Sequence, residues 1–237
     1  MDLAGVKSRL RAIHARTIPP FRALAREFGR MPFKLLDVGC GNHQPTKTKR
    51  YFPSCAYYGV DITSDYNNDE ADLRAMERFW QIDLTRLQFG EIPDSFFDAI
   101  VMNHVIEHLA NGDRVVAALI PKLKPGGIVY VEFPGPRSLG LPSMPGTLNF
   151  KDDPSHVRLF TAAEVSRVME AGGCRVLDAG TRRVWARVAA TPLVMAYHRA
   201  RRGTFLGGAL WDLTGFAEYV LARRSNGTDR RSAKGGG

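Results

Sequence analysis

Residues 33–42 constrain the fold of this chain more than any other stretch. A short apolar run ends at Asp37 and then breaks into Gly39, Cys40 and Gly41. This pattern is typical of a buried parallel strand that turns tightly toward a helix. Glycine permits positive φ and leaves no side chain to obstruct a ligand. Because open α/β sheets bind ligands at the carboxyl ends of their strands, the turn predicts a ligand site.

A second apolar run, residues 57–61, ends in Asp61, 24 residues after Asp37. A carboxylate at this point can accept hydrogen bonds from both hydroxyls of a ribose, although Asp also commonly serves as a helix N-cap. The loop after the first strand lacks the third glycine of the dinucleotide pattern. The two segments therefore predict a nucleoside-containing cofactor other than a dinucleotide.

Three more apolar segments follow in order. Residues 79–84 read as a strand ending in Asp83, residues 96–103 as a strand ending in Asn103, and residues 128–133 as a strand after Pro and Gly stop signals. Taken together, the chain resembles class I S-adenosylmethionine-dependent methyltransferases. The resemblance is carried by Leu-Leu-Asp-Val-Gly-Cys-Gly at 35–41, Asp61, Phe-Asp-Ala-Ile at 97–100 and Leu-Lys-Pro-Gly-Gly at 123–127.

The resemblance implies a Rossmann-like α/β fold: a seven-stranded, mostly parallel sheet with an antiparallel last strand and helices on both faces. It also implies S-adenosylmethionine as the cofactor, S-adenosylhomocysteine as the product, and no metal. The residues that it assigns to the cofactor are Asp37, Val38, Gly39, Cys40, Gly41, Asp61, Ile62, Asp83, Leu84, Asn103 and His104.

The chain is expected to divide into a helical cap (1–30), a methyltransferase domain (31–190), an amphipathic helical extension (191–224) and a disordered tail (225–237). Within the domain, residues 174–179 and 184–190 are expected to pair as the closing hairpin. The extension interleaves aromatic residues with Arg. That composition is typical either of helices packed on the domain or of a peripheral contact with a membrane or a lipid-linked substrate.

Composition bounds the partners and the compartment. With 237 residues, 44% of them hydrophobic, the chain is long enough for one full core. A net charge of +9 suits an anionic partner. The three scattered cysteines indicate a reducing compartment, and the sequence shows neither a secretory signal nor a spanning segment. We expect a cytoplasmic protein, peripheral at the inner membrane surface if it meets a membrane, with its oligomeric state left open.

His104, His108 and His156 are candidate catalytic bases, because histidine exchanges protons near neutral pH. His104 and His108 are expected to share a helix face with Glu107 beside them. His156 follows a long segment rich in Pro, Gly and Ser that is expected to cover the pocket. The main hypothesis is O-methylation of a small-molecule or glycan- or lipid-linked acceptor by in-line displacement, with His156 or His104 as the base.

Two alternatives stay open. His104, Glu107, His108 and His156 could bind a divalent metal. They are similar to the Glu-x-x-Glu-His…His set of metal-dependent small-RNA 2′-O-methyltransferases, with His104 at the place of the first Glu. RNA is the less favoured partner, because the sequence shows no RNA-binding module. The other alternative is a protein that binds S-adenosylmethionine without catalysis.

Overall fold

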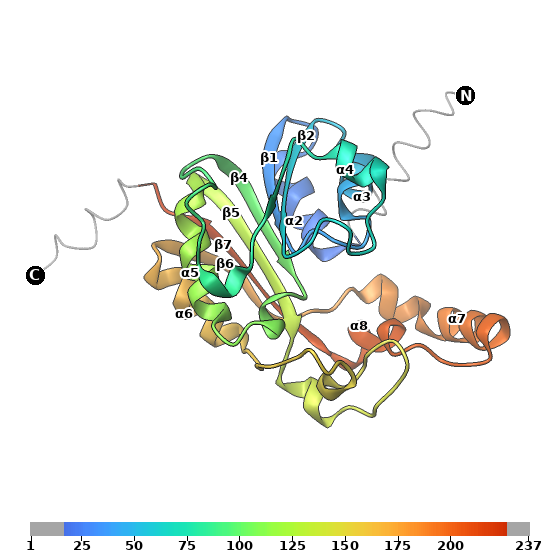
Figure 1. Ribbon diagram of the computed structural model, residues 1–237. Helices are drawn as coiled ribbons and strands as arrows, with labels where there is room; N and C mark the ends of the chain where they lie inside the picture. Colours follow the sequence, from blue (N-terminus) through green and yellow to red (C-terminus); the bar gives the residue numbers. More distant parts are fainter. Residues whose placement is uncertain (1–16, 227–237) are drawn as a thin grey trace, which may run out of the picture.

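The computed structural model describes residues 17–226, and its centre is a seven-stranded sheet of order β3-β2-β1-β4-β5-β7-β6 (Figure 1). Strands β1 to β5 run parallel, and β7 is antiparallel to both of its neighbours, β5 and β6. The predicted fold class is therefore confirmed. The strands are β1 Phe33–Val38, β2 Cys55–Asp61, β3 Arg78–Gln81, β4 Phe97–Asn103, β5 Leu123–Pro134, β6 Cys174–Thr181 and β7 Ala217–Arg224.

Helices cover both faces of the sheet, with α2, α3 and α4 on one side and α5 and α6 on the other (Figure 1). The α-helices are α2 Pro19–Phe28, α3 Gln44–Tyr51, α4 Glu70–Ala75, α5 Gly112–Leu119, α6 Ala162–Ala171, α7 Trp185–Arg202 and α8 Trp211–Thr214. The 3-10 helices are η1 Leu84–Arg86, η2 Ile106–His108, η3 Ile120–Lys122, η4 Pro136–Gly140, η5 Phe150–Asp152 and η6 Gly207–Leu210.

The sheet has an apolar core on each face because successive strand residues point to opposite sides. Leu35 and Val101 belong to the core that also holds Phe21 of α2. Their chain neighbours Leu36 and Ile100 belong to the other core, with residues of α5 and α6. Since both faces are buried, the strands read as continuous apolar runs rather than as alternating ones.

The strand that closes the sheet differs from the predicted one. β6 pairs with β7, whereas residues 184–190 form the start of α7. Four of the seven residues in that segment are Ala or Arg, which favour an α-helix. The predicted hairpin and the predicted helical extension are therefore wrong in this part. Residues 217–224 lie inside the sheet, and the boundary predicted at residue 190 falls within α7.

The predicted helical cap is described only from residue 17 onward, where α2 packs Phe21 and Leu24 into a core. Glu27 of α2 also forms a 2.6 Å ion pair with Arg223 of β7. The remaining part of the cap (1–16) and most of the predicted tail (227–237) lie outside the described residues. Among the helices of residues 17–226, none combines the length and apolar composition needed to cross a membrane.

Candidate active site

A cavity of about 610 Å³ lies where β1, β2 and β4 end. The loops that follow these parallel strands meet at one edge of the sheet, which is where α/β folds bind ligands. Most of the predicted site residues share this cavity. They are Gly39, Asp61, Ile62, Asp83, Leu84, Asn103, His104, His108 and His156.

Four other residues predicted to contact the cofactor are buried and do not line the cavity: Asp37, Val38, Cys40 and Gly41. They shape the turn instead. Gly39 has a φ of 75°, and a Cβ there would lie 2.3 Å from Cγ2 of Val105. A side chain at this position would therefore both strain the backbone and collide with the next loop.

Asp61 and Asn103 bring polar oxygens to the cavity wall. The Asp61 Oδ1 accepts a hydrogen bond from the backbone N–H of Ile62 at 2.7 Å. Burial raises the pKa of Asp61, and neighbouring backbone N–H groups oppose that rise. The Asn103 Oδ1 is buried and has no hydrogen-bond donor among residues 17–226. A carboxylate and an open amide oxygen in one cavity suit a ligand with hydroxyl and amino donors.

Asp83 lines the cavity and also caps η1. Its Oδ1 accepts from the backbone N–H of Thr85 at 3.0 Å and from the Thr85 hydroxyl at 2.6 Å. These hydrogen bonds lower the pKa of Asp83, so it is an ionised acceptor at neutral pH. The role of Asp83 in binding the cofactor stays a prediction.

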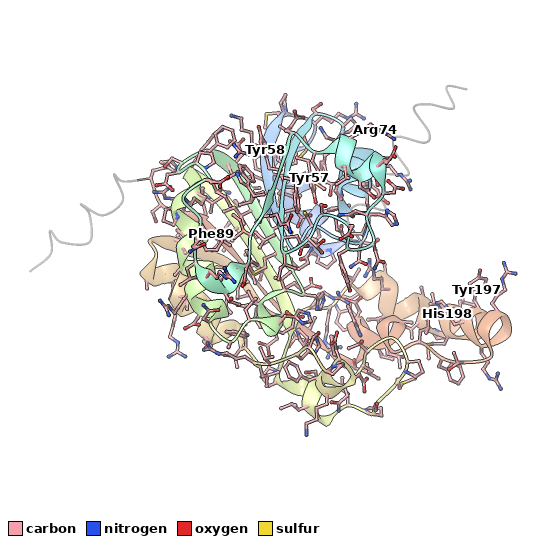
Figure 2. All side chains as sticks on the ribbon, viewed as in Figure 1. Tyr57, Tyr58, Arg74, Phe89, Tyr197 and His198 are labelled. Atoms are coloured by element: carbon pink, nitrogen blue, oxygen red, sulfur yellow. The ribbon has the colours of Figure 1, made fainter. Side chains whose placement is uncertain are left out.

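Asp37 carries a buried carboxyl group that forms no ion pair with a cation within residues 17–226. The Tyr57 hydroxyl donates to its Oδ2 at 2.6 Å, and Figure 2 labels Tyr57 among the strands. Burial raises the pKa of Asp37 to about 7, although the bond from Tyr57 opposes the rise. The group therefore supports the turn from inside the fold rather than as a permanent surface charge.

His104 does not share a helix with His108, because it takes a left-handed φ of 52° in the turn before η2. Its Nδ1 lies 3.2 Å from Oε1 of Glu107, and its Nε2 lies 3.2 Å from Oε1 of Glu132. Burial by itself lowers the pKa of His104, but the two hydrogen bonds raise it to about 9. At that pKa both ring nitrogens carry a hydrogen at neutral pH, which disfavours His104 as the base. The predicted shared helix face is wrong, and the base role of His104 stays a prediction.

Glu132 links His104 to the segment between β6 and β7. Arg182 donates to it from Nη1 at 2.7 Å and reaches Asp212 of α8 from Nη2 at 3.1 Å. Burial alone would raise the pKa of Glu132, but Arg182 and His104 lower it to about 2. The ring of Trp211, also in α8, lies 4.8 Å from the His104 ring. Buried charge pairs thus fix this wall of the cavity.

His156 reaches the cavity because its loop is bound to η2. The backbone N–H of Val157 donates to the carbonyl oxygen of Glu107 at 2.9 Å. The side chain of His156 is only 5% exposed, and its Nδ1 lies 2.7 Å from the carbonyl oxygen of Phe150. Because a carbonyl oxygen only accepts, Nδ1 carries a hydrogen. In the neutral ring the lone pair therefore sits on Nε2.

His108 has the same tautomer for a similar reason. The Ser155 hydroxyl donates to Oδ1 of Asp153 at 2.5 Å, so its oxygen accepts from Nδ1 of His108 at 2.9 Å. The rings of His108 and His156 lie 4.9 Å apart. Ligand atoms of Glu107, His108 and His156 all lie within 4.8 Å of one another, and His104 is not part of that group.

Comparison with known proteins identifies the family. The sequence profile described as "Methyltransferase domain" matches residues 6–179 of the chain. The chain belongs to this methyltransferase family. A curated relative is a probable S-adenosylmethionine-dependent methyltransferase of Mycolicibacterium smegmatis, 29% identical over 154 residues, which are 61% of this chain. The match spans about half (52%) of that relative's own length.

Solved structures share the fold of this chain at low sequence identity. A Mesorhizobium loti S-adenosylmethionine-dependent methyltransferase has a TM-score of 0.58 and 16% identity, over 89% of this chain and 98% of that one. A Haemonchus contortus phosphoethanolamine N-methyltransferase, solved with S-adenosylmethionine, has a TM-score of 0.59 and 16% identity, over 86% of this chain and 51% of that one. The [4+2]-cyclase SpnF has a TM-score of 0.56 and 22% identity, over 93% and 82%.

The cofactor of this methyltransferase family is S-adenosylmethionine, and the residues present fit it. Gly39 keeps the turn free of a side chain at the cavity, and Asp61 can accept from the ribose hydroxyls. The buried oxygen of Asn103, which lacks a protein donor among the residues described, can accept from the ammonium group of the cofactor.

Several residues of the site were not predicted from the sequence. Glu132 did carry a signal, because it is the one charged residue in the apolar run 128–133 and stands near the end of a strand. Buried charges are normally paired. Trp211 and Phe216, which line the cavity, gave no such signal, since they lie about 110 residues beyond β4 and reach it only through the folded segment between β6 and β7.

Proposed function

We propose that this protein transfers the methyl group of S-adenosylmethionine to an oxygen of a small-molecule, glycan-linked or lipid-linked acceptor, with His156 as the base. One observation carries the proposal. The cavity that holds Asp61 and Asn103 also holds His156, whose hydrogen bond to Phe150 leaves the lone pair on Nε2. The residues proposed to bind the cofactor and the proposed base therefore line the same cavity.

The bound cofactor supplies an electrophilic methyl group on a sulfonium. The acceptor oxygen attacks that carbon in line with the departing sulfur, and the electron pair of the broken bond remains on sulfur. The hydroxyl proton moves to Nε2 of His156. Oε1 of Glu107 lies 4.0 Å and Oδ2 of Asp153 lies 3.9 Å from Nε2, so two carboxylates favour the imidazolium that forms.

The test is transfer of labelled methyl from S-adenosylmethionine into a cell extract, with RNA, protein, lipid and saccharide pools separated afterwards. Label is expected in the lipid or saccharide pool. His156→Asn should slow transfer roughly 100-fold or more, because a positioned base contributes about that factor, and should leave cofactor affinity unchanged. His198→Asn on α7, outside the cavity lining, is the matched control. Transfer at the wild-type rate in His156→Asn would contradict the base role.

A second function has an observation in its favour. Glu107, His108 and His156 form a compact group, both histidines hold their lone pairs on Nε2, and Oε2 of Glu107 is buried without a hydrogen-bond donor in the described structure. Neutral imidazoles and a carboxylate are ligands for Zn²⁺ or Mn²⁺. Such a site would support metal-dependent methylation of an RNA 2′-hydroxyl.

Metal removal separates the two functions. With His156 as a simple base, transfer survives EDTA, and His108→Asn keeps most of the wild-type rate. With a metal, EDTA and His108→Asn both abolish transfer, added Mn²⁺ or Zn²⁺ restores the wild-type protein, and the label appears in the RNA pool. Binding of S-adenosylmethionine without label in any pool would favour the third hypothesis, a cofactor-binding protein without methyl transfer.

A further inference from the structure

One side of helix α7 is apolar and open to solvent. Trp185, Ala189, Leu193 and Tyr197 follow one another at intervals of four residues. That spacing places their side chains along one face of the helix. Trp185 is 71% exposed, Leu193 77% and Tyr197 57%. Contiguous exposed apolar residues of this size mark an interaction surface more often than chance exposure does.

The other side of α7 is the one that anchors it. Thr191 is buried, and Arg187 reaches Oδ2 of Asp212 at 3.6 Å. The backbone N–H of Val184, just before the helix, donates to Oδ1 of Asp212 at 3.0 Å. The polar side of the helix therefore attaches it to the domain, and the apolar side does not belong to either core. Figure 1 shows α7 projecting from the sheet, and Figure 2 shows Tyr197 and His198 toward its far end.

The charged side chains of α7 have one sign. The helix contains four Arg and no Asp, Glu or Lys, and one of the four, Arg187, faces Asp212 of the domain. Arg199 and Arg201 are exposed near the end of α7, and the Arg201 guanidinium lies 5.8 Å from the centre of the Tyr197 ring. An apolar face flanked by arginines and aromatic rings is the pattern of a helix that lies in a membrane interface.

We infer that α7 docks on an anionic membrane surface, with Trp185, Leu193 and Tyr197 among the acyl chains and Arg199 and Arg201 at the headgroups. Negative headgroups complement the charge of the exposed Arg199 and Arg201. A second copy of the chain would not, because a symmetric contact through α7 would place these arginines against each other.

Membrane binding by α7 does not depend on which acceptor the protein methylates. What it implies about the acceptor rests on the proposed function. α7 leads through η6 into α8, whose Trp211 lines the cavity. A protein held by α7 would therefore have its cavity wall next to the membrane attachment, which favours the lipid-linked class of acceptor.

The experiment is vesicle flotation of the full chain with phosphatidylglycerol-containing vesicles and with phosphatidylcholine vesicles. We expect binding to the anionic vesicles only, weakening as salt rises. The double variant Leu193→Glu with Tyr197→Glu should lower the vesicle affinity at least ~10-fold, because each change removes an apolar side chain from the interface. Leu73→Glu on α4, 44% exposed on another part of the surface, should bind as the wild type does.

Cofactor affinity provides the check on folding, since neither Leu193 nor Tyr197 lines the cavity. The variant should retain it. The inference is overturned if the wild-type protein fails to float with anionic vesicles, or if the double variant floats as well as the wild type. It is also overturned if the protein is a dimer that the double variant converts to a monomer, since α7 would then be covered by a second copy. A wild-type protein that binds the anionic vesicles but transfers no methyl group would count against the proposed function alone.

Discussion

The two halves of the sheet each bury a carboxyl group, and they stabilise it in different ways. In the amino-terminal half, Asp37 of β1 is bonded to the hydroxyl of Tyr57, and burial raises its pKa to about 7. In the carboxyl-terminal half, Glu132 of β5 is buried as deeply, but Arg182 and His104 contact it and lower its pKa to about 2. Burial disfavours the charged form of both groups, and only a paired cation reverses the outcome.

The two carboxyl groups differ because their hydrogen-bonding partners come from different parts of the chain. Tyr57 lies on the strand next to Asp37, so local pairing of β1 with β2 supplies the contact. Arg182 follows β6 and meets Glu132 from 50 residues away, together with Asp212 of α8. The carboxyl-terminal wall of the cavity therefore depends on buried ion pairs, whereas the glycine turn depends on backbone geometry.

Arg182→Ala should have the largest effect on stability. It leaves Glu132 and Asp212 buried without their main cation, and breaking a buried pair in this way costs about 3–5 kcal/mol. The free energy of unfolding from urea denaturation measures the loss. Arg183→Ala is the matched control, because Arg183 donates only to the backbone oxygens of Asp212 and Leu213, contacts worth about 1 kcal/mol. Equal losses in the two variants would mean that buried ion pairs do not hold this wall.

Asp61→Ala tests the amino-terminal half. If Asp61 accepts hydrogen bonds from two ribose hydroxyls, as we propose, its loss should weaken binding of S-adenosylmethionine about 100-fold or more, as measured by titration calorimetry. Asp65→Ala, in the loop after β2 and outside the cavity lining, should keep the wild-type affinity. If the two variants bind the cofactor equally well, Asp61 does not hold the ribose.

Asp37→Asn should have the smallest effect, a change in how stability depends on pH. It tests whether the carboxyl group without a paired cation among residues 17–226 titrates differently from Glu132. The pKa of Asp37 rises on folding from 3.8 to about 7. The native state therefore binds more protons between these values. The contribution of Asp37 to stability is complete below pH 3.8 and is lost as the pH rises through about 7.

The variant lacks this titration, so its stability relative to the wild type should improve by about 2–3 kcal/mol from about pH 5 to about pH 8. Urea denaturation at several pH values measures the change. A difference that stays constant with pH would show that the carboxyl group of Asp37 titrates normally in the fold.

Much of the fold could be predicted from the chain alone. The second strand ends at Asp61 as the pattern predicted, and the first strand ends at Val38, one residue beyond the predicted Asp37. The glycine turn follows the first strand, as predicted. These features depend on burial of both sheet faces and on the φ angles of single residues. Short stretches of sequence determine both the burial pattern and these φ angles.

The last strand could not be predicted, because its partner is distant. Residues 184–190 lie closest to β6 along the chain and contain Val and Trp, yet β6 pairs with residues 217–224. Likewise, His104 was a candidate base on residue type alone. Its pKa depends on Glu132, 28 residues away, and Glu132 depends in turn on Arg182.

The sequence by itself determined the class of fold, the glycine turn and the acidic residues at the ends of the first strands, since each rests on local backbone geometry and burial pattern. Only the tertiary structure decided which groups surround each histidine, which segment completes the sheet and which face of α7 is left uncovered. Those outcomes depend on the charges and surfaces that distant segments bring together, and a charge acts through its distance in space rather than along the chain.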